Sequence, residues 1–91
     1  MSKVKVRHIL VQHEYQAKDV LRSLSLGEEF SLLARKFSLC SSAAGGGNLG
    51  LVAKSRLDDQ FVEAIDLLEA YQVSPPVRTK FGWHIIQKLT I

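Results

Sequence analysis

The sequence predicts an α+β domain, an antiparallel sheet with helices packed around it, and three observations lead to this. Residues 4–11 and 81–89 read as strands, since their side chains alternate with period two and valine, isoleucine and aromatic residues favour extended backbone. Between them, apolar side chains recur at helical spacing in three separate segments. The strands and helices do not alternate as βαβ units, so the sheet is expected to be antiparallel.

The length of 91 residues fits one domain, and we expect residues 1–91 to form it without an internal boundary. No apolar run is long enough to cross a membrane, and residues 1–7 lack the apolar block of a signal peptide. The single cysteine, Cys40, has no partner for an internal disulfide, which fits a reducing compartment. The sequence therefore predicts a cytoplasmic protein without membrane association.

The net charge of +3 leaves nucleic acid open as a partner. However, lysine and arginine are scattered along the chain, without a dense basic run or interleaved aromatic residues. A solvated basic surface is therefore favoured over a nucleic-acid site.

The first strand and two helices make up the N-terminal part of the chain. The strand places alternate side chains on opposite faces, with Val4, Val6, His8 and Leu10 on one and Lys5, Arg7, Ile9 and Val11 on the other. From Glu14 to Ser25 the spacing becomes helical, and Gly27 provides the stop. A shorter helix ends near Ser38 and has the apolar positions Phe30, Leu33, Ala34 and Phe37.

A loop of small residues, 40–50, leads into the C-terminal part. A short strand is predicted at residues 49–53, and Asp58 and Asp59 place negative charge where the dipole of a third helix favours it. The apolar positions of that helix are Phe61, Ala64, Ile65 and Leu68. Two prolines at 75–76 then turn the chain, a brief strand forms around Val77, and the strand from Phe81 closes the domain.

Residues 45–50, Gly-Gly-Gly-Asn-Leu-Gly, match the glycine pattern of a dinucleotide-binding loop. That loop needs a strand before it and a helix after it, whereas here a helix precedes it and a strand follows. We therefore expect these glycines to permit tight backbone geometry around a pocket rather than to bind a nucleotide.

Cys40 has three interpretations from the residues alone. It is a candidate nucleophile with His8 or His84 as its base. The same three side chains are part of a metal set, but a fourth ligand and metal-type spacing are missing, so no metal site is predicted. Most lone cysteines are buried structural thiols, and spacing does not rank these readings.

His8 and His84 each lie centrally in a predicted strand, among apolar side chains. A buried polar group needs a partner, and adjacent antiparallel strands would bring the two rings within hydrogen-bonding distance. Two satisfied core histidines explain the pattern equally well. His13, just past the first strand, is expected in an exposed loop.

Two segments are specific when they occur together, His-Ile-Leu-Val at residues 8–11 and Phe-Gly-Trp-His-Ile-Ile at residues 81–86. Between and around them stand further matching segments, which are Phe30 to Ala34, Ser38 to Ser42, Gly46 to Gly50, Phe61, and Thr79 to Lys80. In this order and spacing, over essentially the whole chain, the sequence resembles the parvulins, which are peptidyl-prolyl cis/trans isomerases.

The resemblance implies a four-stranded antiparallel sheet in which the two histidine strands are central neighbours. It implies that His8 and His84 hydrogen-bond each other, that Thr79 belongs to their polar network, and that Cys40 lies over the bond being rotated. The substrate site would include Leu49, Leu57, Phe61 and Phe81 around the proline ring, together with Asn48 and Asp58. The implied function is rotation of X-Pro bonds in proline-containing polypeptides during folding, by a monomer without a cofactor.

The chemistry of this reaction suits a site without a covalent step. An apolar pocket that desolvates the amide favours the twisted transition state, and the histidine pair would orient and tune Cys40 rather than activate it. The link from the first strand to the first helix, residues 12–14, has no cation cluster, so we expect no phosphate requirement. Asp58 and Asp59 are expected to disfavour an acidic residue before proline.

Four positions depart from the family pattern. Asn48 stands where aspartate is usual, which removes a charge that would shift the protonation of the histidines. Leu57 replaces a frequent methionine at similar volume. Asp66 replaces a phenylalanine and so removes an expected core contact, and Tyr71-Gln72 replaces a common Gly-Glu turn.

Three other classes of protein compete with this interpretation. A binding module of the same fold would hold proline-containing segments, but it does not need Cys40 and both histidines together. A small nucleic-acid-binding protein is supported by charge alone. A cysteine hydrolase would need a carboxylate partner for a histidine and an oxyanion hole, and neither is evident. The joint presence of Cys40, His8 and His84 favours the isomerase.

Overall fold

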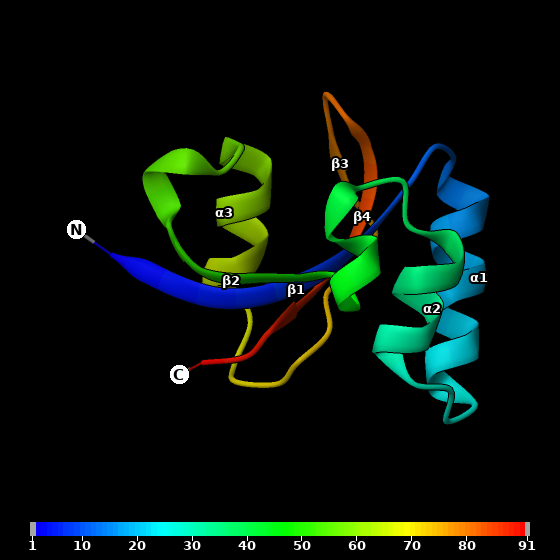
Figure 1. Ribbon diagram of the computed structural model, residues 1–91. Coiled ribbons are helices and arrows are strands. Elements are labelled where there is room, and N and C mark those ends of the chain that lie inside the picture. Colours follow the sequence, from blue (N-terminus) through cyan, green and yellow to red (C-terminus); the bar gives the residue numbers. More distant parts are fainter. Residues whose placement is uncertain (1, 91) are drawn as a thin grey trace.

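The computed structural model describes residues 2–90 of the predicted 1–91 domain, and its elements follow the predicted order (Figure 1). In chain order these are β1 (Lys3–Val11), α1 (Glu14–Ser25), α2 (Phe30–Phe37), the 3₁₀ helix η1 (Ser41–Gly45), β2 (Asn48–Ala53), the 3₁₀ helix η2 (Lys54–Arg56), α3 (Asp59–Asp66), β3 (Val77–Thr79) and β4 (Gly82–Lys88). Within residues 2–90 no helix is long and apolar enough to span a bilayer.

The four strands form one antiparallel sheet in the order β2-β1-β4-β3, which confirms the predicted α+β fold class. The strands that carry the histidines, β1 and β4, are the two central ones. In their register His8 lies opposite Ile86, and His84 lies opposite Leu10. The two histidines are therefore diagonal neighbours on one face, within reach of each other.

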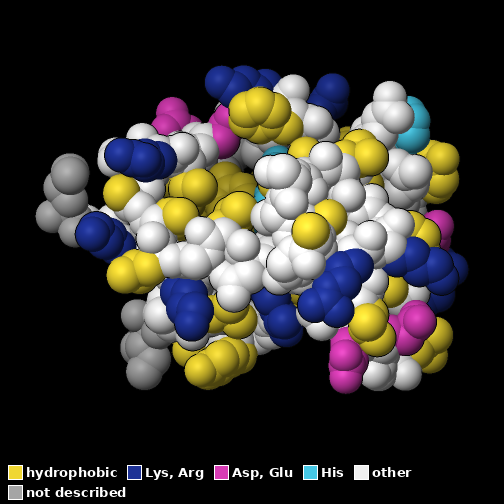
Figure 2. Space-filling view, in the orientation of Figure 1, with side chains coloured by type: hydrophobic (Ala, Val, Ile, Leu, Met, Phe, Trp, Pro, Cys, Tyr) yellow, Lys and Arg dark blue, Asp and Glu magenta, His cyan; other side chains and the backbone are white. Residues whose placement is uncertain are grey.

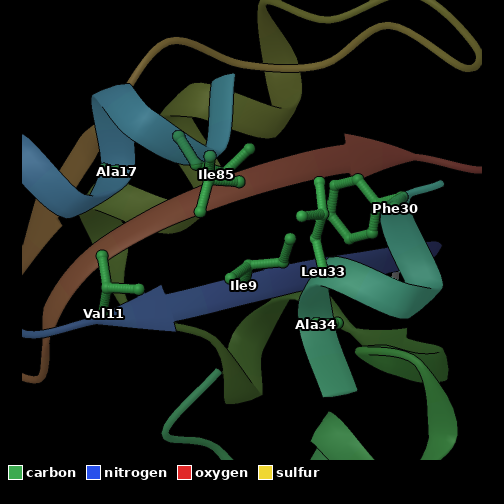
Figure 3. Close-up of a cluster of buried hydrophobic side chains, with 8 residues drawn as sticks. Ile9, Val11, Ala17, Phe30, Leu33, Ala34 and Ile85 are labelled. Carbon is green, nitrogen blue, oxygen red and sulfur yellow. The ribbon is translucent and has the colours of Figure 1, made fainter. Parts of the chain in front are cut away.

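Alternation along the two central strands divides the core into two layers. Ile9, Val11 and Ile85 point to one face, where α1 and α2 cover them with Phe30, Leu33 and other side chains (Figure 3). The next residues in each strand point to the opposite face, where α3 covers Val6 and Ile86 with Phe61 and Ile65. The histidines belong to this second face.

Gly47 holds the small-residue loop against β1 with the tight backbone geometry that was expected of these glycines. Its carbonyl accepts the N–H of His8 at 2.9 Å, and its φ of +84° lies in the left-handed region that favours glycine. A Cβ at position 47 would lie 2.3 Å from the carbonyl oxygen of His8. Only glycine therefore lets η1 approach the strand beside this histidine.

The structure explains two of the departures from the family pattern. Asp66 is exposed and forms an ion pair of 2.7 Å with Lys54, so it faces solvent and not the core. Tyr71 adopts a φ of +67°, a conformation that glycine accepts more readily. Leu68, predicted as part of the third helix, lies beyond its end at Asp66 but is still buried, because the last turn tightens with bonds from Leu67 to Ala64 and from Leu68 to Ile65.

Candidate active site

The two histidines meet on the α3 face of the sheet, at the centre of a buried polar network. Each side chain is only 4% exposed, and the two Nδ1 atoms lie 2.9 Å apart. The rings are stacked, with 5.1 Å between centroids and 16° between planes. The predicted hydrogen bond between His8 and His84 is therefore confirmed.

The network continues beyond both rings. Nε2 of His84 lies 2.8 Å from Oγ1 of Thr79, which also accepts the N–H of Phe81 at 3.1 Å. Nε2 of His8 lies 3.4 Å from Oγ of Ser42, the second residue of η1. Thr79 was expected in this network and Ser42 was not. The signal for Ser42 was its place in a run of small polar residues after Cys40.

The hydrogen bonds assign a direction to the network. An Nδ1–Nδ1 bond needs one N–H and one lone pair, so two neutral rings must be in different tautomers. The hydroxyl proton of Thr79 has no other acceptor among the described residues, so it is directed to Nε2 of His84. His84 then carries its proton on Nδ1 and donates to His8, whose Nε2–H points to Ser42.

Both histidines are held neutral by their surroundings. Burial is the larger cause and the nearby His84 the smaller one, and together they lower the pKa of His8 to about 4. Burial also lowers the pKa of His84 to about 4, against the opposing effect of the Asp58 carboxylate. The chain of neutral donors and acceptors therefore persists throughout the physiological pH range.

Cys40 reaches the histidines only through a serine. Its side chain is half-buried, and within residues 2–90 the recorded polar contacts of its side chain are to Ser42 and Ser41, not to His8 or His84. Burial raises the pKa of the Cys40 thiol, but hydrogen bonds from Ser42 and Ser41 outweigh burial and leave the pKa below its ordinary value. The expected coupling of the histidine pair to Cys40 thus runs through Ser42.

An apolar surface lies beside the network. Phe61 is 3% exposed and packs edge-on against both rings, 5.6 Å from His8 and 5.2 Å from His84 between centroids. Leu49 and Leu57, both partly buried, pack on the same cluster. Figure 2 shows a hollow on this face with hydrophobic side chains in its floor and histidine atoms at its edge.

Leu49 reaches this surface through an irregularity in β2 that the sequence did not reveal. The register between β1 and β2 slips between Val6 and Arg7, so Leu49 is the extra residue of a β-bulge. Gly50, directly after it, has a φ of +70°. The bulge turns Leu49 toward the α3 cluster although simple alternation would send it to the other face.

Three of the predicted substrate-site residues lie outside the apolar cluster beside the histidines. Phe81 lies in the β3–β4 turn with 64% of its surface exposed and does not pack on the α3 cluster, so its role at the proline ring stays a prediction. Asn48 is exposed, and its Oδ1 accepts the N–H of Gly50 at 2.7 Å. The carboxylate that raises the pKa of His84 is instead that of Asp58, which occupies the N-cap position of α3.

Within residues 2–90 no group of three or more His, Cys, Asp or Glu side chains is placed to hold a metal ion. The site therefore consists of a neutral hydrogen-bonded network, a thiol with a lowered pKa, and an apolar floor. Such a site can hold an uncharged apolar group and orient a few polar atoms next to it.

Comparison with known proteins gives a consistent family. A family model described as "Rotamase: PPIC-type PPIASE domain" matches residues 6–90. Foldase protein PrsA of Bacillus subtilis is 42% identical over 88 residues, which cover 96% of this chain and 30% of that protein. The parvulin-like PPIase of Rickettsia conorii is 40% identical over 92 residues, which cover 97% of this chain and 33% of that protein.

A solved structure extends this likeness to the fold. NmPin, the parvulin of Nitrosopumilus maritimus, superposes with a TM-score of 0.86 at 37% identity, and the match covers 98% of this chain and 97% of that one. The chain spans about a third of the length of the two curated relatives named above.

The neutral histidine pair predicts a stability that depends on pH. The folded pKa values of about 4 lie below the ordinary 6.5, so the unfolded chain binds more protons between these values. Stability is therefore complete above pH 6.5 and falls as the pH drops toward 4, by up to roughly 3 kcal/mol for each histidine. Urea unfolding at a series of pH values measures this loss.

The matched control for this measurement is the exposed histidine at position 13. His13→Gln should leave the pH dependence as it is, whereas His84→Gln should reduce its slope between pH 4.5 and 6.5. An equal slope in wild type and His84→Gln would show that the pair is not the source of the dependence.

Proposed function

Because the chain belongs to the PPIC-type peptidyl-prolyl isomerase family, the parvulins, we propose that this site rotates X-Pro bonds of polypeptides without a covalent intermediate. Rotation about an X-Pro bond is slow because it must break amide resonance, against a barrier of roughly 18–20 kcal/mol. In the twisted transition state the carbonyl oxygen carries less charge and the proline nitrogen carries more. An apolar site that excludes water from the amide lowers the barrier by favouring this state.

The observation that supports a non-covalent mechanism is that all four ring nitrogens of His8 and His84 already have hydrogen-bond partners. Both Nδ1 atoms are taken by the bond between the rings, and the Nε2 atoms are taken by Ser42 and Thr79. A nucleophilic cysteine needs a free basic nitrogen within hydrogen-bonding reach of its sulfur. Neither histidine offers one, which counts against the cysteine hydrolase considered from the sequence.

Each part of the site then has a defined task. The apolar side chains of Phe61, Leu49 and Leu57 support the contact surface for the proline ring. The thiol of Cys40, which hydrogen-bonds to Ser42, is expected at the polar side of this surface. His8 and His84 are positioning residues, because they hold η1 and the β3–β4 turn at fixed places on the sheet.

The substrates are proline-containing polypeptides, which the domain isomerises during folding, and no phosphate is needed. β1 ends at Val11 and α1 begins at Glu14, so the connection between them offers Gln12 and His13 and no lysine or arginine. A phosphate group is bound by such cations. A monomeric state and a cytoplasmic location are further proposals, which rest on the sequence.

The non-covalent mechanism predicts a graded set of variants. Cys40→Ala should retain measurable isomerase activity on an X-Pro peptide, within about tenfold of wild type, because no bond to sulfur is formed. His84→Ala should lose more activity, since it leaves Thr79 and Nδ1 of His8 without their partner in a buried site. A proline-isomerisation assay on wild type and both variants measures this, with His13→Ala as the control.

Two results would contradict this account. Complete loss of activity in Cys40→Ala, together with a trappable acyl-enzyme, would show that the thiol is a nucleophile. Wild-type activity no higher than that of His84→Ala would favour the binding module of the same fold.

Asp58 predicts a preference for the residue before proline. Its carboxylate acts on the pKa of His84, and it directly follows Leu57, which is proposed to support the proline ring. We expect X = Lys to be turned over faster than X = Glu in a peptide series, and Asp58→Asn to shrink the difference. The value of kcat/KM at two salt concentrations measures this, and equal or better turnover for X = Glu by the wild type would refute it.

A further inference from the structure

A second hollow lies around the end of the sheet from the histidine site. It has a volume of about 300 Å³ and lies between α1, the end of β1 and the end of α2, with Val11, Tyr15, Val20 and Phe37 as its apolar lining. Tyr15 is 64% exposed and Phe37 is 46% exposed, so two aromatic side chains that line it face water. We call this hollow the Tyr15 pocket.

An apolar path joins the Tyr15 pocket to the histidine site. Residues 38–39 lie beside β1, beyond the point where the pairing of β1 with β2 ends. The N–H of Leu39 donates to the carbonyl of Leu10 at 2.8 Å, and the N–H of Leu10 donates to Oγ of Ser38 at 3.0 Å. Leu39 is 65% exposed and stands directly before Cys40. Exposed apolar side chains therefore connect Phe37, at the pocket, with Cys40, at the site.

The other side of the path is formed by β1 and the β3–β4 turn. Leu10 is partly exposed, lies two residues beyond His8 on the same face, and has its Cδ1 next to Gly82. Figure 2 shows hydrophobic side chains at intervals along the upper edge of the face that holds the hollow. Leu10 and Leu39 thus place partly exposed or exposed apolar side chains between the Tyr15 pocket and the site at which the X-Pro bond is proposed to lie.

The spacing fits an extended polypeptide. Val11, which lines the pocket, lies three residues beyond His8 in β1, a distance of about 10 Å at 3.3 Å per residue. An extended peptide covers this distance in about three residues. Val11 points to the face opposite His8, so the peptide would pass over residues 38–39 at the end of the sheet, and a side chain at least three residues from the proline is needed to reach the Tyr15 pocket.

We propose that the Tyr15 pocket is a second substrate subsite, which binds an apolar side chain about three residues from the proline in the same extended polypeptide. The proposal rests on the proposed isomerase function, since the first site holds the X-Pro bond. With this second subsite, the preferred substrate would be an unfolded segment that has an apolar residue near the proline. In a folded protein such a residue is usually buried and cannot enter the pocket.

Two peptides of nine residues test the subsite. Both have Lys-Pro near the centre, and they carry either leucine or serine three residues to each side of the proline. The wild type should show a kcat/KM about fivefold higher for the leucine peptide, because part of the leucine surface is removed from water. Tyr15→Ser and Leu39→Ser should bring this ratio close to one, whereas Leu67→Ser should keep it. Leu67 is the matched control because it is 85% exposed and does not line the pocket.

A direct binding measurement keeps the subsite separate from the activity. The leucine peptide with alanine in place of proline should shift the backbone amide resonances of Asp19 and Ser23, which line the pocket, and the serine peptide should not. If the wild type isomerised neither peptide while these shifts appeared, the isomerase function would fail and the subsite would stand. A leucine-to-serine ratio of one in the wild type, or a ratio that survives both Tyr15→Ser and Leu39→Ser, would overturn the subsite.

Discussion

The hydrogen bond between the Nδ1 atoms of His8 and His84 is the contact on which the arrangement of the site depends. Two imidazole rings on the inner face of a sheet, each 4% exposed, cost free energy unless their polar atoms are paired. Each ring satisfies the other at one nitrogen, and the second nitrogens bind Thr79 and Ser42. The pair therefore ties β1 and β4 to the β3–β4 turn on one side and to η1 on the other.

This arrangement explains how a site that is proposed to act without a covalent step can be precise. Buried networks in which every member is satisfied have few alternative arrangements, since each alternative leaves a polar group unpaired. Phe61 packs against both rings and fixes their apolar edges. The thiol of Cys40 is oriented at the far end, through Ser42. In the proposed mechanism a preorganised surface of this kind accelerates bond rotation by holding the twisted amide, and its histidines need not exchange protons with the substrate.

The fold and the histidine pair were predictable, whereas several side chains of the site were not. Period-two alternation predicts both central strands, because one residue in two must face a core, and the family resemblance places the histidines on neighbouring strands. Ser42 escaped prediction because its contact with His8 spans 34 residues and follows no local pattern. The family resemblance places Leu49 at the site, but alternation along β2 alone would not, since Leu49 faces the site only through a bulge; Phe81 is exposed although aromatic. Both depend on tertiary geometry that local spacing does not encode.

The nitrogen resonances of the two rings test this account most directly. In ¹⁵N-labelled protein at pH 7, one ring should carry its proton on Nδ1 and the other on Nε2, and a scalar coupling should connect the two Nδ1 atoms across their 2.9 Å bond. The directed network assigns the Nδ1–H ring to His84 and the Nε2–H ring to His8. Two rings in the same tautomer, or a ring that is charged at pH 7, would contradict the central claim.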